Sequence, residues 1–311
     1  MRTVLMGALG ALLLSSAAPA AEPESCATVR FADVGWTDIT ATTALTSAVL
    51  EGLGYETRAD VLSVPVTYQS LKNGDIDVFL GNWMPTMEAD IAPFKQDGSV
   101  EVVRPNLEGA KYTLAVPTYV ADKGLKDFAD IAKFKDQLDG QIYGIEPGND
   151  GNRLIQTMID EGKFGLAGFE LVESSEQGML AQVERASRGQ DPIVFLAWEP
   201  HPMNTRFKIT YLTGGDEVFG PNFGGATVYT NVRKGYLQEC PNVGKLLQNL
   251  AFALPMESEV MGAILDEGKE PEEAATAWLK ANPGALDGWL AGVATREGGD
   301  GLAAVKEHLG L

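Results

Sequence analysis

Cysteine and histidine are scarce in this chain of 311 residues, which contains two of each. Most transition-metal sites in proteins need several ligands of these two types, so the sequence argues against a metal centre. The motifs G-x-S-x-G, H-E-x-x-H and C-x-x-C and the phosphate-binding P-loop pattern are also absent. We therefore expect no metal, no cofactor and no catalytic residue. A hydrolytic site built from two carboxylates is the alternative, because the chain has 43 acidic side chains.

Basic residues are few as well. The chain has 24 Lys and Arg against 43 Asp and Glu, which gives a net charge of −19. A protein that binds nucleic acid needs a basic surface to neutralise phosphates, so we expect no nucleic acid partner. The same charge argues against binding to an anionic membrane surface, whereas a cationic or neutral ligand is compatible with it.

Long apolar runs are missing from most of the chain. The run at 4–14 follows Arg2 and is too short to span a bilayer, and small residues stand at 18–20. The sequence therefore predicts a secretory signal peptide at 1–20, removed after Ala20 or Ala21, and an exported, periplasmic protein. An uncleaved membrane anchor is the alternative.

The two cysteines, Cys26 and Cys240, both lie in the exported part. In an oxidising compartment an isolated pair favours one disulfide, and two buried free thiols are the alternative. A bridge over so long a loop would stabilise the fold by about 5 kcal/mol at most. It would also bring the start of the exported chain close to the region around residue 240.

Apolar and β-branched segments alternate with segments of helical spacing. Strands are expected at 28–34, 55–62, 76–80, 112–117, 141–145, 169–173, 193–197 and 228–231. Helices are expected at 39–53, 65–73, 126–134, 153–162, 176–188, 243–253, 256–267 and 271–282. Two successive βαβαβ series of this kind predict an α/β fold with mostly parallel sheets covered by helices.

Length, the cysteine pair and the two series together predict two lobes joined by a hinge. Residues 21–112 and 222–311 would form a discontinuous first lobe, and residues 113–221 an inserted second lobe. Two consecutive domains are the alternative, but they would leave the pairing of distant cysteines unexplained.

Three of the five tryptophans, Trp36, Trp83 and Trp198, follow the carboxyl ends of predicted strands. One such tryptophan is more often part of the core than of a site. Three in equivalent positions across two lobes favour a shared ligand site, because ligands of open α/β sheets bind at the carboxyl ends of strands. Trp278 and Trp289 stand in helical segments and are expected to pack in the core.

Asp38 lies two residues after Trp36, where its carboxylate could reach the same cavity or could cap the following helix. Indole faces attract a cation by roughly 0.5 to 2 kcal/mol per ring. A quaternary ammonium group donates no ordinary hydrogen bonds, so several rings with one carboxylate match it well.

The motifs V-G-W-T-D at 34–38, G-N-W-M-P at 81–85 and A-W-E-P-H at 197–201, with the signal peptide and two lobes, resemble the substrate-binding proteins of betaine/choline ABC importers. The resemblance covers nearly the whole exported chain. It implies a type II periplasmic-binding-protein fold that closes on its ligand, a membrane permease as partner, and no enzymatic activity. We further expect a monomer.

The resemblance also implies particular site residues. The expected aromatic box around the trimethylammonium group consists of Trp36, Trp83, Tyr112 and Trp198. Asp38 matches the acidic residue beside the cation, and Asn149 matches the residue that would bind the hydroxyl end of the ligand. Asn149 could instead be a turn residue, and Asn152 is then the alternative candidate for the hydroxyl end.

Charge favours choline over glycine betaine, with acetylcholine as a possible second ligand. Asp38 would repel the carboxylate of betaine, and the nearest basic residues are Arg153 and His201, neither of which belongs to the box. Glycine betaine or proline betaine is the alternative ligand. A secreted choline-ester hydrolase and a purely structural exported protein are alternatives from other classes.

Overall fold

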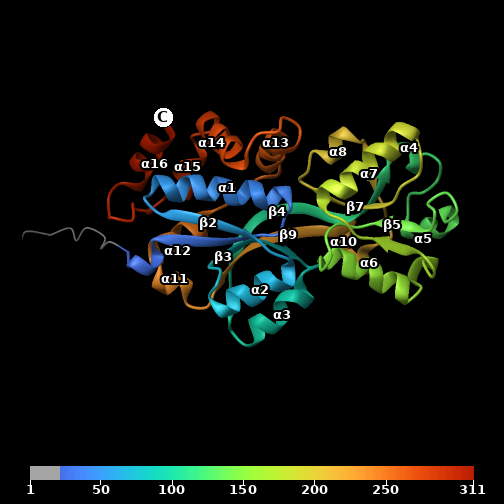
Figure 1. Cartoon of the computed structure of the whole chain (residues 1–311), viewed down its shortest axis with the longest axis horizontal. Helices are drawn as coiled ribbons and strands as arrows, with labels where there is room; N and C mark the ends of the chain where they lie inside the picture. The colour runs from blue at the N-terminus through green and yellow to red at the C-terminus, as the bar shows by residue number, and fades with distance from the viewer. Residues whose placement is uncertain (1–21) are drawn as a thin grey trace, which may run out of the picture.

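The computed structural model describes residues 22–311, and the expected signal peptide at 1–20 lies outside them. The chain forms two lobes that lie side by side along the long axis of the molecule (Figure 1). Among the described residues, no helix is long and apolar enough to cross a bilayer.

The first lobe contains three parallel strands in the order β2-β1-β3. These strands are β1 (Thr28–Asp33), β2 (Glu56–Val61) and β3 (Val78–Met84). The short helix η1 (Glu24–Cys26) precedes them, and α1 (Thr37–Gly52), α2 (Val64–Asn73) and α3 (Glu88–Gln96) follow the first, second and third strands. This is the βαβαβ series expected from the first part of the sequence.

The second lobe repeats this arrangement with the parallel strands β7-β5-β6. Its strands are β5 (Gln141–Tyr143), β6 (Glu170–Val172), β7 (Phe195–Glu199) and β8 (Ile209–Tyr211). Its longer helices are α6 (Asp150–Asp160) and α7 (Glu176–Gly189). The short ones are α4 (Thr118–Ala121), α5 (Phe128–Ile131), η2 (Ala132–Phe134), η3 (Lys163–Gly165), α8 (Met203–Arg206), α9 (Asp216–Phe219) and α10 (Pro221–Gly224).

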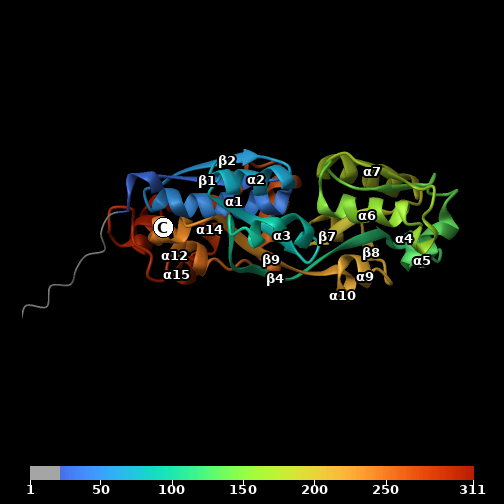
Figure 2. The same ribbon diagram turned by 90° about the horizontal axis from the view of Figure 1, so that it is seen from below.

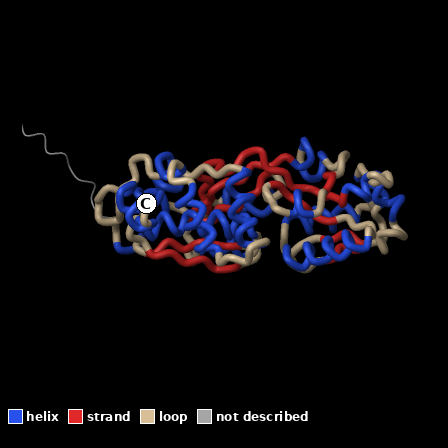
Figure 3. The backbone as a smooth tube through the Cα atoms, turned by 90° about the horizontal axis from the view of Figure 1, so that it is seen from above, coloured by secondary structure: helices blue, strands red, loops and turns tan. Residues whose placement is uncertain are grey.

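Two strands join the lobes. The 18-residue β4 (Val100–Pro117) and β9 (Gly225–Arg233) pair antiparallel and run along one side of the molecule from one lobe to the other (Figure 2). They complete a sheet with the order β2-β1-β3-β9-β4-β7-β5-β6, and β8 pairs with β4. Strands therefore continue from lobe to lobe, whereas the helices gather within each lobe (Figure 3). This arrangement suits a hinge.

The C-terminal helices complete the first lobe. They are α11 (Tyr236–Glu239), α12 (Pro241–Asn249), α13 (Leu254–Leu265), α14 (Pro271–Ala281), α15 (Ala285–Trp289) and α16 (Gly301–Leu309). Helices α13, α14 and α16 pack on α1, which lies between them and the sheet (Figure 1). Helix α1 is buried on nearly every side, as expected of a helix that is rich in Ala, Thr and aliphatic residues all round.

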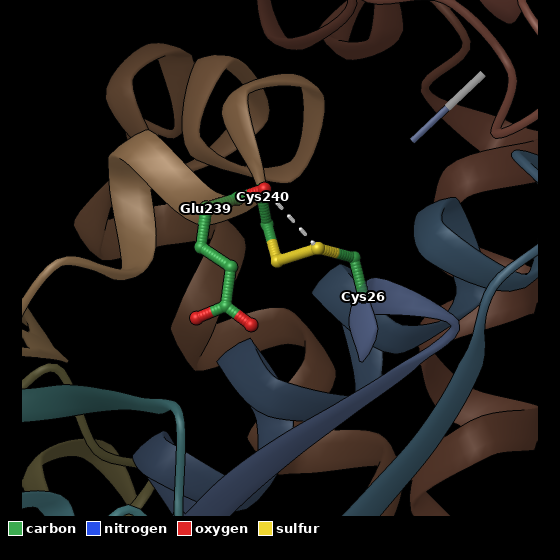
Figure 4. Close-up of side chains that lie close together, drawn as sticks. All are labelled: Cys26, Glu239 and Cys240. Carbon is green, nitrogen blue, oxygen red and sulfur yellow. Dashed lines mark hydrogen bonds between the residues drawn. A yellow bond between two sulfur atoms is a disulfide. The ribbon is translucent and has the colours of Figure 1, made fainter. Parts of the chain in front are cut away.

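The predicted disulfide is confirmed. Cys26 and Cys240, separated by 214 positions, are bonded where η1 meets the α11–α12 junction (Figure 4). These sulfurs and Glu239 also form the one group of three metal-type ligands among the described residues, but a disulfide sulfur is not a thiolate ligand. The group is therefore structural.

Several element boundaries differ from the prediction. The sequence predicts that β3 ends at residue 80, before Gly81, but the strand continues to Met84. A glycine commonly interrupts a strand, but here it allows close packing of α1, since a Cβ at position 81 would lie 2.7 Å from Ile39 Cδ1. Trp83 is therefore the penultimate residue of β3, and Trp198 is likewise the penultimate residue of β7, so neither lies in a loop. Helix α3 is absent from the sequence-based prediction.

Candidate functional site

The aromatic residues singled out in the sequence converge between the lobes. Trp36 is the N-cap residue of α1, and Trp83, Tyr112 and Trp198 lie in β3, β4 and β7. All four are only 3–5% exposed. Together with Asp38 and Ile145 they line a small cavity.

The rings are inclined to one another and are not stacked face to face. The centroids of Trp83 and Tyr112 lie 5.9 Å apart at an interplanar angle of 53°, and those of Tyr112 and Trp198 lie 6.5 Å apart at 73°. Tyr112 and Trp198 are direct partners in the β4–β7 ladder, which fixes their spacing. Rings set at such angles form walls of a cavity.

Asp38 supplies a carboxylate to this cavity. Its Oδ2 accepts a hydrogen bond of 3.2 Å from Trp83 Nε1, and its Oδ1 has no partner among the described residues. The alternative of a helix cap is wrong, because α1 begins at Thr37 and is capped at Trp36. Burial, followed by the nearby Glu176 carboxylate, raises the pKa of Asp38. A bound cation would favour the ionised carboxylate and so lower this pKa again.

A second carboxyl lies behind Asp38. Glu257 of α13 is buried, and its pKa is raised by burial and then by Asp38.

Besides Asp38 Oδ1, one more buried polar atom of the lining residues, Trp198 Nε1, has no hydrogen-bond partner within residues 22–311. Native proteins leave few buried polar atoms unpaired, so unpaired atoms at a cavity point to ligand binding.

Glu146 and Ile145 belong to the site although no sequence pattern selects them. Ile145 lines the cavity, and Glu146 Oε1 accepts a hydrogen bond of 2.6 Å from Trp36 Nε1 across the two lobes. Burial raises the pKa of Glu146 to about 7. Their only signal in the sequence is that they precede the P-G-N-D-G loop at the end of a predicted strand.

Asn149 and its rival Asn152 lie beside the cavity but are not among its lining residues. Asn149 caps α6, and its Oδ1 accepts hydrogen bonds from Tyr112 Oη at 2.9 Å and from the amide of Asn152 at 3.0 Å. The side chain of Asn152 bonds to both backbone groups of Ile145 and to the Glu146 carbonyl. Asn149 therefore supports Tyr112, and Asn152 holds the 145–146 segment.

The two basic residues singled out in the sequence form their contacts within the protein. Arg153 forms a bidentate ion pair with Asp90, at 2.7 and 2.8 Å. His201 accepts a hydrogen bond from the amide of Met203 and contacts Glu176. Neither lines the cavity, so the described residues offer no free basic side chain there to a ligand carboxylate.

Two lobes that enclose a small aromatic and acidic cavity define a ligand-binding protein of the type II periplasmic class. Residues 27–281 match the family described as the substrate binding domain of ABC-type glycine betaine transport systems. The chain belongs to this family of substrate-binding proteins.

Solved structures agree with this assignment. The chain is 72% identical to an ABC-transporter choline binding protein in complex with choline, with a TM-score of 0.92 over 93% of this chain and 100% of that one. An ABC-transporter choline binding protein in an unliganded semi-closed conformation has the same identity and coverage but a TM-score of 0.85. Lactococcal OpuAC in its closed complex with glycine betaine is 27% identical, with a TM-score of 0.76 over 84% of this chain and 98% of that one.

Proposed function

We propose that this chain captures choline between its lobes and delivers it to the membrane permease of an ABC importer. The observation that carries the proposal is the cavity, in which four aromatic rings meet a buried carboxylate oxygen that has no hydrogen-bond partner in the described part of the chain. The 72% identity to a choline-binding protein crystallised with choline supports the same ligand. Export by a signal peptide at 1–20 would place the protein in the periplasm.

The proposed site residues are those expected from the sequence. Trp36, Trp83, Tyr112 and Trp198 would surround the trimethylammonium group, and Asp38 would neutralise its charge. Asn149 would act at the hydroxyl end. The proposed lobe boundaries, 21–112 with 222–311 and 113–221, lie on or near the connecting strands β4 and β9, where a hinge motion would occur.

Charge favours choline over glycine betaine as the ligand. The carboxylate of betaine would share the small cavity with Asp38, whose ionised form would repel it. The basic groups of Arg153 and His201 are bound within the protein and do not line the cavity. Glycine betaine, which the 27% identical lactococcal relative holds, is the second candidate.

Titration of tryptophan fluorescence tests the choice of ligand. Choline should bind to the wild-type chain more tightly than glycine betaine, with acetylcholine measured alongside. Asp38→Asn should reduce choline affinity and narrow the difference between the two ligands. Asp136→Asn makes the same chemical change at an exposed position of the second lobe. It should alter neither the choline affinity nor the difference in affinity between the two ligands. Equal or tighter binding of glycine betaine to the wild-type chain would reject choline as the ligand.

Mass spectrometry after prolonged incubation separates binding from hydrolysis. A binding protein returns choline and acetylcholine unchanged, whereas a choline-ester hydrolase would convert acetylcholine to choline and acetate. We expect no conversion above that of a buffer control, because the family consists of substrate-binding proteins.

A further inference from the structure

Like Glu146, Glu176 is a carboxylate that joins the two lobes without lining the cavity. Glu176, in the first turn of α7 in the second lobe, accepts two hydrogen bonds from Thr37 of α1 in the first lobe. Its Oε2 accepts from the Thr37 amide at 2.8 Å, and its Oε1 accepts from Thr37 Oγ1 at 2.6 Å. The Glu176 side chain is fully buried, so water does not compete for these bonds.

His201 holds Glu176 from within the second lobe. The amide of Met203 can only donate, so His201 Nδ1 is the acceptor of that 2.9 Å hydrogen bond. The imidazole proton therefore lies on Nε2, which donates to Glu176 Oε1 at 3.2 Å. The carboxylate is thus held by a residue of its own lobe as well as by Thr37.

Thr37 stands between two residues of the proposed site. Trp36 precedes it and donates its indole N–H to Glu146, while Asp38 follows it and accepts from Trp83. A contact that holds the amide and hydroxyl of Thr37 therefore restrains the backbone that carries both a ring and the carboxylate of the box. Glu176 reaches the site through Thr37 and not by touching the cavity.

We propose that Glu176 is a positioning residue that keeps the lobes closed over the bound ligand and so determines how slowly the ligand leaves. This inference rests on the proposed function of the site. When the lobes separate, Glu176 retains His201 but loses both bonds from Thr37. The contact is formed only after closure, so it acts on the dissociation rate and leaves the association rate unchanged.

Stopped-flow measurement of choline association and dissociation tests this role. Thr37→Val keeps the shape and the amide of residue 37 but removes the hydroxyl donor. It should raise the dissociation rate about tenfold, as expected for the loss of one buried hydrogen bond to a charged group, with the association rate unchanged. Glu176→Gln also removes a charge that raises the pKa of Asp38, so its effect is compared between two backgrounds. It should raise the dissociation rate by a smaller factor in the Thr37→Val chain, where the hydroxyl contact is already lost, than in the wild-type chain.

Thr57→Val is the matched control. Thr57 Oγ1 donates to Glu51 at 2.8 Å in the same kind of Thr–Glu pair, but that pair is exposed and lies within the first lobe. This variant should leave both rates unchanged. The melting temperature of the ligand-free chain should differ little between the Thr37→Val and wild-type proteins, because the contact joins the lobes and belongs to neither core.

The outcomes separate the two proposals. If the wild-type chain binds choline and Thr37→Val dissociates at the wild-type rate, or if the two effects multiply fully, the role of Glu176 is rejected and the function stands. If the wild-type chain binds glycine betaine but not choline, the choice of ligand is rejected and the same variants test Glu176 with betaine. Binding of neither ligand rejects both proposals.

Discussion

The indole nitrogen of Trp83 donates a 3.2 Å hydrogen bond to Asp38 Oδ2, so one wall of the aromatic cavity orients the carboxylate of that cavity. An N–H bond lies in the plane of its ring, and this contact therefore leaves the faces of the indole available. Trp36 is restrained in the same way by Glu146. Two of the three indole rings are thus held through their N–H edges, and their faces remain free for a cation.

Removal of each ring should weaken ligand binding more than it weakens the fold. Trp36→Ala, Trp83→Ala and Trp198→Ala are each expected to reduce choline affinity by about 1 to 3 kcal/mol, through lost cation–π attraction and poorer exclusion of water. Tyr112→Ala should act more mildly, because a phenol presents a smaller face than an indole. Affinity and ligand-free melting temperature are measured on every variant.

Trp289→Ala is the control for these ring variants. Trp289 is 4% exposed, packs on Phe252 and donates to the carbonyl of Ala251. Its loss should cost roughly 3 to 5 kcal/mol of stability and leave the affinity of the folded protein near normal. Trp278 is the poorer control because it is only partly buried and bonds to Glu259 at the surface. Box variants that melt early yet bind normally would contradict the box.

Choline affinity should depend on pH. Burial raises the pKa of Glu146 from 4.5 to about 7 and also raises that of Asp38. A bound cation favours the ionised form of both groups, so binding lowers both pKa values and releases protons. The ionisation of Glu146 should therefore make affinity rise with pH between about 5 and 7, and this contribution should level off above that range.

Calorimetry in buffers of different ionisation enthalpy at about pH 6 measures this proton release. Glu146→Gln should reduce the number of protons released and flatten the pH profile, because residue 146 then no longer titrates. An affinity that is constant from about pH 5 to 8 in the wild-type chain would show that neither carboxyl is coupled to the ligand.

Reduction of the disulfide should lower the melting temperature by several degrees. The Cys26–Cys240 bridge closes a loop of 214 residues, for which the chain-entropy model gives a stabilisation of about 5 kcal/mol at most. The double variant Cys26→Ala with Cys240→Ala should melt at the lower temperature and show no response to reductant. Two free thiols in the native exported protein would contradict the prediction.

Asn149 and Asn152 should be distinguishable with two ligands. Asn149→Ala is expected to weaken choline binding by about 1 kcal/mol more than tetramethylammonium binding, because tetramethylammonium lacks the hydroxyl group. Asn152→Ala should weaken both ligands equally, since this side chain holds the backbone of Ile145 and Glu146. Equal losses for Asn149→Ala would mean that it acts through Tyr112 alone.

Much of the fold and site follows from local patterns in the sequence. Alternating strands and helices predict an α/β fold, and the carboxyl ends of parallel strands meet at one edge, so the order of the segments is enough to place Trp36 and Trp83 together. Two cysteines allow only one intramolecular pairing, so the sequence also links the start of the exported chain to residue 240. Tyr112 is selected only through the family resemblance.

The contacts between the lobes could not be predicted from any sequence pattern. Trp36 and Glu146 are 110 positions apart, and Thr37 and Glu176 are 139 apart. Neither glutamate belongs to a motif, because its partner lies in the other lobe and the contact depends on the angle between lobes. The sequence by itself determined which rings and which carboxylate could form a cation site. Only the tertiary structure determined which side chains join the lobes beside that site, since such contacts depend on the three-dimensional packing of distant segments and not on local spacing.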